Sequence, residues 1–135
     1  MSEERELDLA GRVIGLAMKV HRKLGPGFLE SVYENALALE LTRAGLPFER
    51  QKPLQVHYEG VVVGDFAADL LIEGTLIVEL KAVSAIAPVH EVQLVNYLTT
   101  TGIEDGLLLN FGAASLEFKR KYRTYRAPQA KDLVL

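Results

Sequence analysis

The sequence lacks several features that would assign it to a class at once. Its 135 residues contain no cysteine, which excludes disulfides, iron–sulfur clusters, thiolate zinc sites and a cysteine nucleophile. A metal ion would have to bind oxygen or imidazole ligands. No apolar run approaches the roughly 20 residues that span a membrane, and the start MSEERELD does not have the basic end and apolar run of a secretory signal. We therefore expect a soluble, cytoplasmic protein with no membrane contact.

An excess of positive charge is also missing. The formal net charge is −3, so no overall field would attract nucleic acid, and a polyanionic partner would need a local basic patch. What the chain does have is a core: 49% of its residues are hydrophobic, and there is no internal repeat or low-complexity tract. These features predict one folded domain over residues 1–135.

Three segments have the pattern of helices. Apolar residues recur at steps of three and four over residues 7–24 and 28–44, which predicts two amphipathic helices, each followed by a glycine. A third helix is predicted over residues 88–101, since proline at its first position suits the first turn of a helix.

The remaining segments have the pattern of strands. Residues 54–58 alternate apolar and polar side chains, which is typical of a half-buried strand. Residues 65–72 and 75–83 are apolar at nearly every position and predict central strands covered on both faces. Two more strands are predicted over 106–111 and 116–125. The fold class is therefore α/β, with a mixed sheet flanked by helices.

The segment TLIVELKAV at residues 75–83 places two charges in the middle of an apolar strand. Residues two apart on a strand point to the same face, so Glu79 and Lys81 project together, and Asp69 interrupts the strand before. Two carboxylates that converge on a sheet can hold a hard cation such as Mg²⁺, and a lysine beside them can orient water or stabilise charge at phosphorus. The alternative is a buried salt bridge without chemistry, which is a weak source of stability.

The third helix carries a polar stripe. His90, Gln93 and Tyr97 follow one another at steps of three and four and therefore share a face. If that face lies over the sheet beside the carboxylates, these side chains can bind a ligand. The alternative is that they point into solvent.

In this order the charged and polar residues resemble the core pattern of the PD-(D/E)XK nuclease superfamily, in its RecB-like form. The pattern consists of Asp69, the Glu-Leu-Lys at 79–81, and Gln93-x-x-x-Tyr97 on a following helix. The proline that conventionally precedes the aspartate is replaced by Ala68.

The likeness extends to a small family within that superfamily. GFLESVY at 27–33 is similar to the GxxExxY signature, and GLLLNFG at 106–112 also resembles this family. The resemblance covers roughly residues 10–125. It implies a restriction-endonuclease-like core in the order α-βββ-α-β.

The resemblance also implies an activity: metal-dependent hydrolysis of phosphodiester bonds in nucleic acid, with DNA as the expected substrate, in a repair or defence system and with a homodimer as one possible assembly. Asp69 and Glu79 would bind Mg²⁺ or Mn²⁺, and Lys81 would be the catalytic lysine. The alternative is a catalytically silent module that keeps the fold to bind nucleic acid or a protein partner, because a fold does not determine a function.

The other site residues follow from the same resemblance. Glu30 would be the helix carboxylate that approaches the metal, and Glu34, one turn later, competes for that role. A first-turn acid is also favoured by the helix dipole alone. Gln93 and Tyr97 would position the substrate phosphate or the lysine.

A basic, aromatic run near the C-terminus is the candidate for holding nucleic acid, because lysine and arginine neutralise phosphates and tyrosine stacks on bases. A solvated face is the other interpretation of such a run. A smaller cluster comprises His21, Arg22 and Lys23. The run consists of Lys119, Arg120, Lys121, Tyr122, Arg123, Tyr125 and Arg126.

The hairpin between the two central strands presents a difficulty. With a simple two-residue turn at 73–74, Asp69 and Glu79 would point to opposite faces of the sheet and could not share a metal, since directly opposed residues share a face. We therefore predict an odd offset. A three-residue connection over 73–75 would produce it, as would a bulge beside either carboxylate, and the Glu-Gly turn dipeptide favours the bulge.

Overall fold

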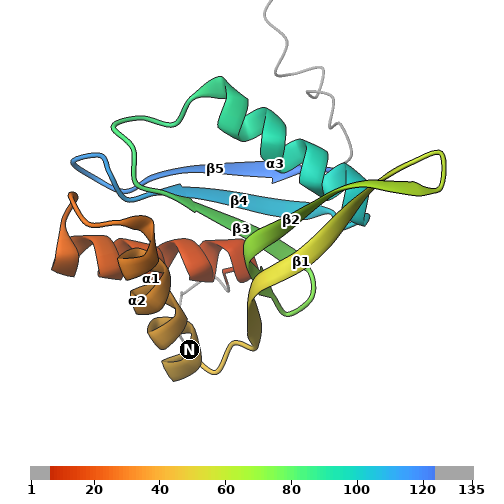
Figure 1. Cartoon of the computed structure of the whole chain (residues 1–135). Coiled ribbons are helices and arrows are strands. Elements are labelled where there is room, and N and C mark those ends of the chain that lie inside the picture. The colour runs from red at the N-terminus through yellow and green to blue at the C-terminus, as the bar shows by residue number, and fades with distance from the viewer. Residues whose placement is uncertain (1–6, 124–135) are drawn as a thin grey trace, which may run out of the picture.

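Three helices and a five-stranded mixed sheet make up the fold in this computed structural model, which describes residues 7–123 (Figure 1). The helices are α1 (Leu9–Leu24), α2 (Glu30–Arg43) and α3 (Pro88–Thr101). The strands are β1 (Phe48–Tyr58), β2 (Val61–Ile72), β3 (Leu76–Lys81), β4 (Asp105–Asn110) and β5 (Glu117–Tyr122). Helices α1 and α2 cover one face of the sheet, and α3 covers the other (Figure 1).

The strands lie side by side in chain order, β1-β2-β3-β4-β5. Only β3 and β4 run parallel, and the connection between them passes through α3. A parallel pair needs such a crossover, whereas the antiparallel pairs on either side are joined by short connections. The predicted α/β class and the α-βββ-α-β order are confirmed. No helix within residues 7–123 is long and apolar enough to cross a bilayer.

Two hydrophobic layers hold the sheet between the helices. The layer against α1 and α2, here the α1/α2 layer, contains the larger number of buried side chains, among them Tyr33, Leu37 and Leu80. The layer against α3, here the α3 layer, is smaller and comprises Ala68, Leu71, Ile77, Leu94, Leu98 and Leu108. Because strand residues alternate between faces, Glu79 and Lys81 lie on the α3 side with Ile77.

The β2–β3 hairpin has the odd offset that the shared site requires. Ile72 pairs with Leu76, so the connection spans the three residues 73–75. Thr75 N donates to Ile72 O (3.0 Å). The two residues between them have positive φ, 53° at Glu73 and 67° at Gly74. The three-residue connection is therefore confirmed as the source of the offset. The expectation that a bulge beside a carboxylate supplies it is wrong, because the pairs from Ile72–Leu76 to Leu70–Val78 already have this offset and are regular.

The outer hairpin is longer than predicted. Strand β1 begins at Phe48 rather than at residue 54, and β2 begins at Val61 rather than at residue 65, so the two form a projecting arm (Figure 1). The first part of β1 contains charged residues and Pro53, so it lacks the alternating apolar pattern from which a strand is predicted. The prediction that β2 is covered on both faces holds only from Ala68 onward, because its first part is largely exposed.

The alternation of side chains reverses in the middle of this hairpin. In β2, Leu70 lies in the α1/α2 layer, but Ala68, two residues earlier, lies in the α3 layer. In β1, Phe48 packs against the α1/α2 layer and Leu54 against the α3 layer, although a regular strand would keep both on one face. The register is constant from the Phe48–Ile72 pair to the Val56–Gly64 pair and shifts only beyond Val56, so both strands reverse at the same level of the sheet.

The residues at this level are Gln51 and Asp69. Gln51 has a φ of 48°, a left-handed conformation that costs a residue other than glycine on the order of 1–3 kcal/mol. Neighbouring pairs Arg50–Leu70 and Lys52–Ala68 are intact. Asp69 therefore lies at the point where the regular alternation of side chains in β2 is interrupted.

The end of β3 is locked to the β4–β5 connection. Asn110 is fully buried, and its Oδ1 accepts from Val83 N (2.9 Å) and Gly112 N (3.0 Å). Phe111 N donates to Lys81 O (2.8 Å). The two segments approach so closely that a Cβ on Gly112 would lie 2.3 Å from Val83 O. Glycine is required there by backbone proximity.

Replacing Gly112 by alanine should lower the free energy of unfolding by about 2–3 kcal/mol, because backbone on both sides must move to admit the methyl group. Gly15→Ala is the matched control. Gly15 lies in α1 with open space around it, and alanine should raise the stability by about 0.5–1 kcal/mol through helix propensity. Urea denaturation of both variants measures the difference, and equal stabilities would contradict the proposed contact.

Candidate active site

A cavity of about 210 Å³ lies on the α3 side of the sheet, bordered by the first residues of α2 and one face of α3. It contains the predicted site residues from four different elements. Its lining consists of Glu30, Ala67, Asp69, Glu79, Lys81, His90, Gln93, Leu94, Tyr97 and Leu108. All six residues that the sequence predicted for metal binding or catalysis are therefore brought to one cavity.

The carboxylates of Asp69 and Glu79 take the place of backbone hydrogen bonds at the point where the pairing of β2 with β3 ends. Regular pairing of β2 with β3 ends at Leu70 and Val78. One residue further along, Asp69 Oδ2 accepts from Leu80 N (2.8 Å), and Asp69 N lies 3.5 Å from Glu79 Oε2. Each carboxylate thus faces the backbone of the opposite strand, which draws the two acids together across the gap.

Glu79 is the most strongly perturbed acid of the cavity. Burial raises its pKa to about 9, helped by the side chain of Asp69 through a hydrogen bond and its charge, while the backbone hydrogen bond from Asp69 and the charge of Lys81 act in the opposite direction. Its Oε1 is buried and has no hydrogen-bond partner among the described residues. A buried oxygen without a partner is costly, so this atom needs a proton or a cation beside it.

The donor set suits a hard divalent cation. In the part of the chain that the structure describes, no three histidine, aspartate or glutamate side chains gather as a complete metal cluster. Asp69 and Glu79 nevertheless offer carboxylate oxygens across one gap, and Mg²⁺ is commonly held by one or two carboxylates together with waters and substrate phosphates. The unpartnered Glu79 Oε1 is the atom that such an ion would satisfy.

Glu30 and Glu34 have different surroundings. Glu30, the first residue of α2, is exposed and lines the cavity. Glu34 is buried, and both of its oxygens have donors: Arg50 Nε and Nη2 on Oε2, each at 2.9 Å, and Gln51 Nε2 on Oε1 at 2.7 Å. Of the two competing acids, Glu30 is therefore the one at the cavity.

The polar stripe of α3 forms the opposite wall. Tyr97 stacks on Phe66 with ring centroids 3.9 Å apart, and its pKa is raised by burial and then by the charges of Glu79 and Asp69. His90 Nδ1 accepts from Ala87 N (3.0 Å), so a neutral ring carries its proton on Nε2. The sequence placed His90 on the same polar stripe as Gln93 and Tyr97 but assigned it no catalytic or metal-binding role, and the structure places it in the cavity lining.

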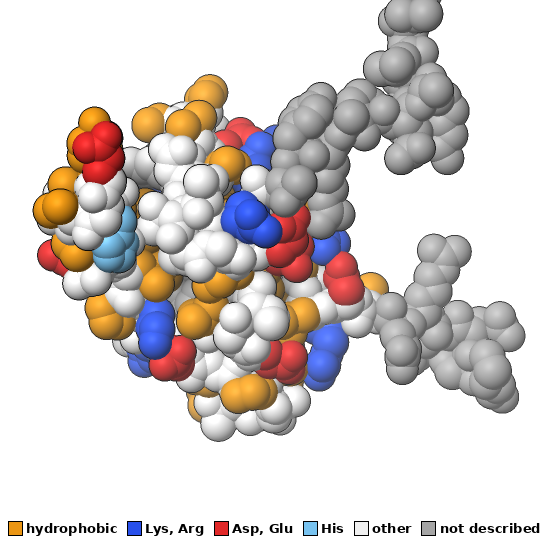
Figure 2. All heavy atoms as spheres, turned by 90° about the vertical axis from the view of Figure 1, so that its right-hand side faces the viewer, with side chains coloured by type: hydrophobic (Ala, Val, Ile, Leu, Met, Phe, Trp, Pro, Cys, Tyr) orange, Lys and Arg blue, Asp and Glu red, His pale blue; other side chains and the backbone are white. Residues whose placement is uncertain are grey.

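The basic run near the C-terminus does not form one surface. Lys119 and Lys121 pair with β4 on the α3 side, whereas Arg120 lies on the other side, where it binds Asp8 (2.6 Å). Lys121 pairs with Glu91 (2.6 Å) and Arg123 with Glu104 (3.4 Å). Basic and acidic side chains also intermingle on the face shown in Figure 2. Residues 125 and 126 of the predicted run lie outside the described residues.

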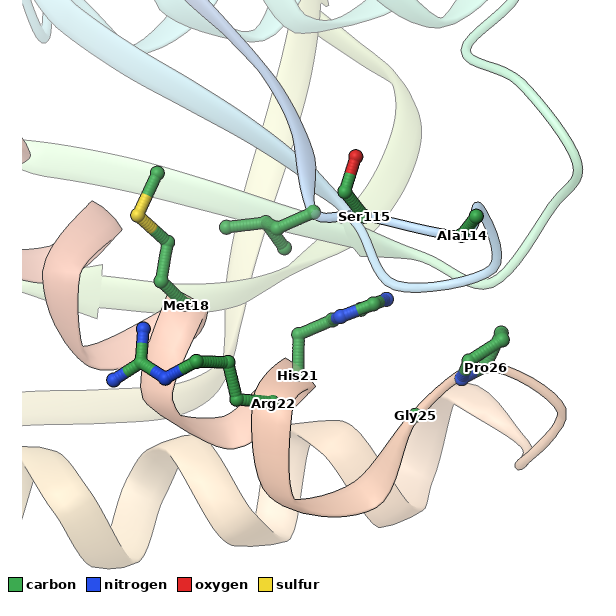
Figure 3. Close-up of a pocket in the computed structure, with 8 residues that line it drawn as sticks. Met18, His21, Arg22, Gly25, Pro26, Ala114 and Ser115 are labelled. Carbon is green, nitrogen blue, oxygen red and sulfur yellow. The ribbon is translucent and has the colours of Figure 1, made fainter.

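A larger cavity, about 560 Å³, lies away from the carboxylates, between the end of α1 and the β4–β5 connection (Figure 3). His21 is buried there, and its Nε2 lies 2.9 Å from Ala113 O, so it serves packing rather than a basic cluster with Arg22. No acidic side chain lines this cavity, which therefore lacks the chemistry of the first. Its lining consists of Met18, His21, Arg22, Gly25, Pro26, Ala114, Ser115 and Leu116.

Two strand carboxylates and a lysine two residues further along β3 thus line one cavity of an α/β fold. The chain belongs to the PD-(D/E)XK nuclease superfamily, since a family profile with that description matches residues 7–121. The match spans every element that contributes to the cavity. None of the curated proteins compared with the chain is detectably similar to it.

Among solved structures, one described as "Crystal structure of SSO0001" is similar at 17% sequence identity, with a TM-score of 0.47. The similarity covers 84% of this chain and 68% of that chain.

The raised pKa of Glu79 predicts how stability depends on pH in the absence of divalent cations. Between the ordinary value of 4.5 and about 9, the unfolded chain ionises this acid while the folded protein keeps it protonated. The contribution of Glu79 is therefore fully present below pH 4.5 and is lost as the pH rises toward 9. Thermal unfolding in EDTA should show wild type losing stability relative to Glu79→Gln over this interval. A constant difference between the two proteins across the interval would contradict the raised pKa.

Proposed function

We propose that the protein hydrolyses phosphodiester bonds in nucleic acid with the help of Mg²⁺ or Mn²⁺, and that DNA is its substrate. The observation that carries the proposal is the convergence of Asp69 and Glu79 across the β2–β3 gap, with Lys81 in the same cavity and one buried carboxylate oxygen left without a partner. If the charged residues formed only a structural salt bridge, the carboxylate oxygens should all have donors, whereas Glu79 Oε1 has none among the described residues.

The roles of the residues follow from their positions. Asp69 and Glu79, with Glu30 at the edge of the cavity, would hold the ion, which when bound supplies Lewis acidity toward the phosphate and lowers the pKa of water. Lys81 would orient the attacking water and stabilise the charge that develops at phosphorus. Gln93 and the Nε2–H of His90, both on the α3 wall, would donate to the phosphate. Tyr97 would help to position the phosphate or Lys81.

The finer assignment rests on sequence similarity. GFLESVY at 27–33 includes the start of α2, which brings Glu30 to the cavity, and this position supports membership of the GxxExxY family. We place the protein in the cytoplasm, in a repair or defence system, as a single domain that acts alone or as a homodimer.

Purified protein should cut DNA in Mg²⁺ or Mn²⁺ and stop in EDTA, and Lys81→Met should slow cutting by about 100-fold or more through loss of transition-state stabilisation. Lys52→Met is the matched control, since Lys52 lies on β1 and pairs at the surface with Glu49. Single-stranded, duplex and branched DNA, and RNA, should all be assayed with fluorescent substrates. Absence of metal-dependent cutting on every one of them would favour the catalytically silent binding module.

Within the basic run, we propose that Lys119 contacts phosphate. It is exposed, and it pairs with Leu108, which lines the cavity, so its side chain extends the same face of the sheet. Arg120 lies on the opposite face in an ion pair with Asp8. Lys121 and Arg123, which are already paired with acids, would contribute less.

Lys119→Glu should therefore weaken DNA binding and lower the slope of log K against log salt by about 0.9 for duplex or 0.7 for single strands, as one phosphate contact is lost. Arg120→Glu is the control on the other face and should leave the slope unchanged. Fluorescence anisotropy in EDTA at several salt concentrations measures both. Equal slopes for the two variants would show that the run is a solvated edge.

A further inference from the structure

Asp69 has one side-chain partner, Gln51, that is not part of the cavity lining. Gln51 Nε2 donates to Asp69 Oδ1 (3.2 Å) and to Glu34 Oε1 (2.7 Å). A single amide group has two N–H donors, so one nitrogen can join both carboxylates at once. Gln51 thus connects the α2 helix to the acid at the β2–β3 gap.

The helix end of this connection is firmly held. Glu34 is buried, and Arg50 neutralises it through two nitrogens on Oε2. The Arg50 guanidinium also donates to Asn35 Oδ1. Glu34 therefore presents Oε1 to Gln51 as a fixed acceptor whose charge is already compensated, and it adds little net charge to the site.

The Asp69 end is held from two sides. Gln51 binds Oδ1 and the Leu80 amide binds Oδ2, so the plane of the carboxylate is determined by one donor on each oxygen. Each oxygen keeps a second lone pair for a cation. Outer-shell hydrogen bonds of this kind orient metal ligands and tune their affinity.

The backbone of Gln51 is strained in a way that the contact explains. Its φ of 48° is uncommon outside glycine, asparagine and aspartate, and it coincides with the reversal of pleating opposite Asp69. Strained backbone persists where surrounding contacts compensate for it. The two hydrogen bonds of the side chain are contacts of that kind.

We infer that Gln51 is a positioning residue that holds Asp69 in the orientation needed to bind a divalent cation, with the Arg50–Glu34 pair as its support. The inference rests on the proposed function. An amide suits this role because it orients the carboxylate without neutralising it. A lysine or arginine in the same place would compete with the cation for the negative charge. Glu34 is then a support for Asp69 and not a metal ligand.

The test uses three variants of the full chain. Gln51→Met keeps the length of the side chain and removes the amide. Gln51→Asn keeps an amide and tolerates positive φ well, but its shorter side chain withdraws the donor from the carboxylates. Gln55→Met is the control, since Gln55 is an exposed glutamine on the same strand.

The first readout needs neither metal nor activity. Because Leu80 N donates to Asp69 Oδ2, hydrogen exchange of the Leu80 amide in EDTA, followed by NMR, reports whether Asp69 is held. We expect faster exchange at Leu80 in Gln51→Met and Gln51→Asn, with no change in Gln55→Met. If both Gln51 variants exchange at the wild-type rate, Gln51 does not position Asp69.

The second readout is the dissociation constant for Mn²⁺, measured by calorimetry. We expect it to rise by about tenfold or more in both Gln51 variants, as for other outer-shell changes at metal sites, and to stay constant in Gln55→Met. If both Gln51 variants bind Mn²⁺ within about twofold of wild type, the inference is overturned. If wild type itself neither binds Mn²⁺ nor cuts DNA, the proposed function fails, and the Leu80 exchange still decides whether Gln51 holds Asp69.

Discussion

The hydrogen bond from the Leu80 amide to the Asp69 carboxylate is the contact on which the arrangement of the site depends. It forms where the β2–β3 ladder stops, so a side chain completes what backbone pairing leaves open. Without it, the two strands would either pair regularly, with no space for a ligand, or separate and leave backbone groups unsatisfied. With it, Asp69 is fixed against β3, and Glu79 meets it across the gap.

The two faces of the sheet divide stability and function between them. The α1/α2 layer contains most of the buried side chains, including the stacked rings of Tyr33 and Phe111 (4.7 Å between centroids). The α3 layer is smaller, and beyond Ile77 it opens into the cavity with Glu79 and Lys81. A buried carboxyl oxygen without a hydrogen-bond partner, such as Glu79 Oε1, is destabilising, so the site depends on the larger layer to keep the protein folded.

How much could be predicted from the sequence depended on the range of each interaction. The shared face of Glu79 and Lys81, and that of Gln93 and Tyr97, follow from the local periods of strand and helix, and the structure places all four in one cavity. The basic run shows the opposite case. Its charges are adjacent in sequence, but the strand period sends Arg120 to one face and Lys121 to the other, where each meets an acid from a distant element.

By itself, the sequence determined the element types, the α/β class and the residues that share a face within a regular element, such as Glu79 with Lys81, since these depend on neighbours within a few positions. Only the tertiary structure decided that the turn, and not a bulge, supplies the offset that sets Asp69 against Glu79, because that depends on how residues 73–75 are placed. It also decided that Glu30 and not Glu34 lines the cavity. That choice depends on Arg50 and Gln51, which reach Glu34 only when β1 packs beside α2.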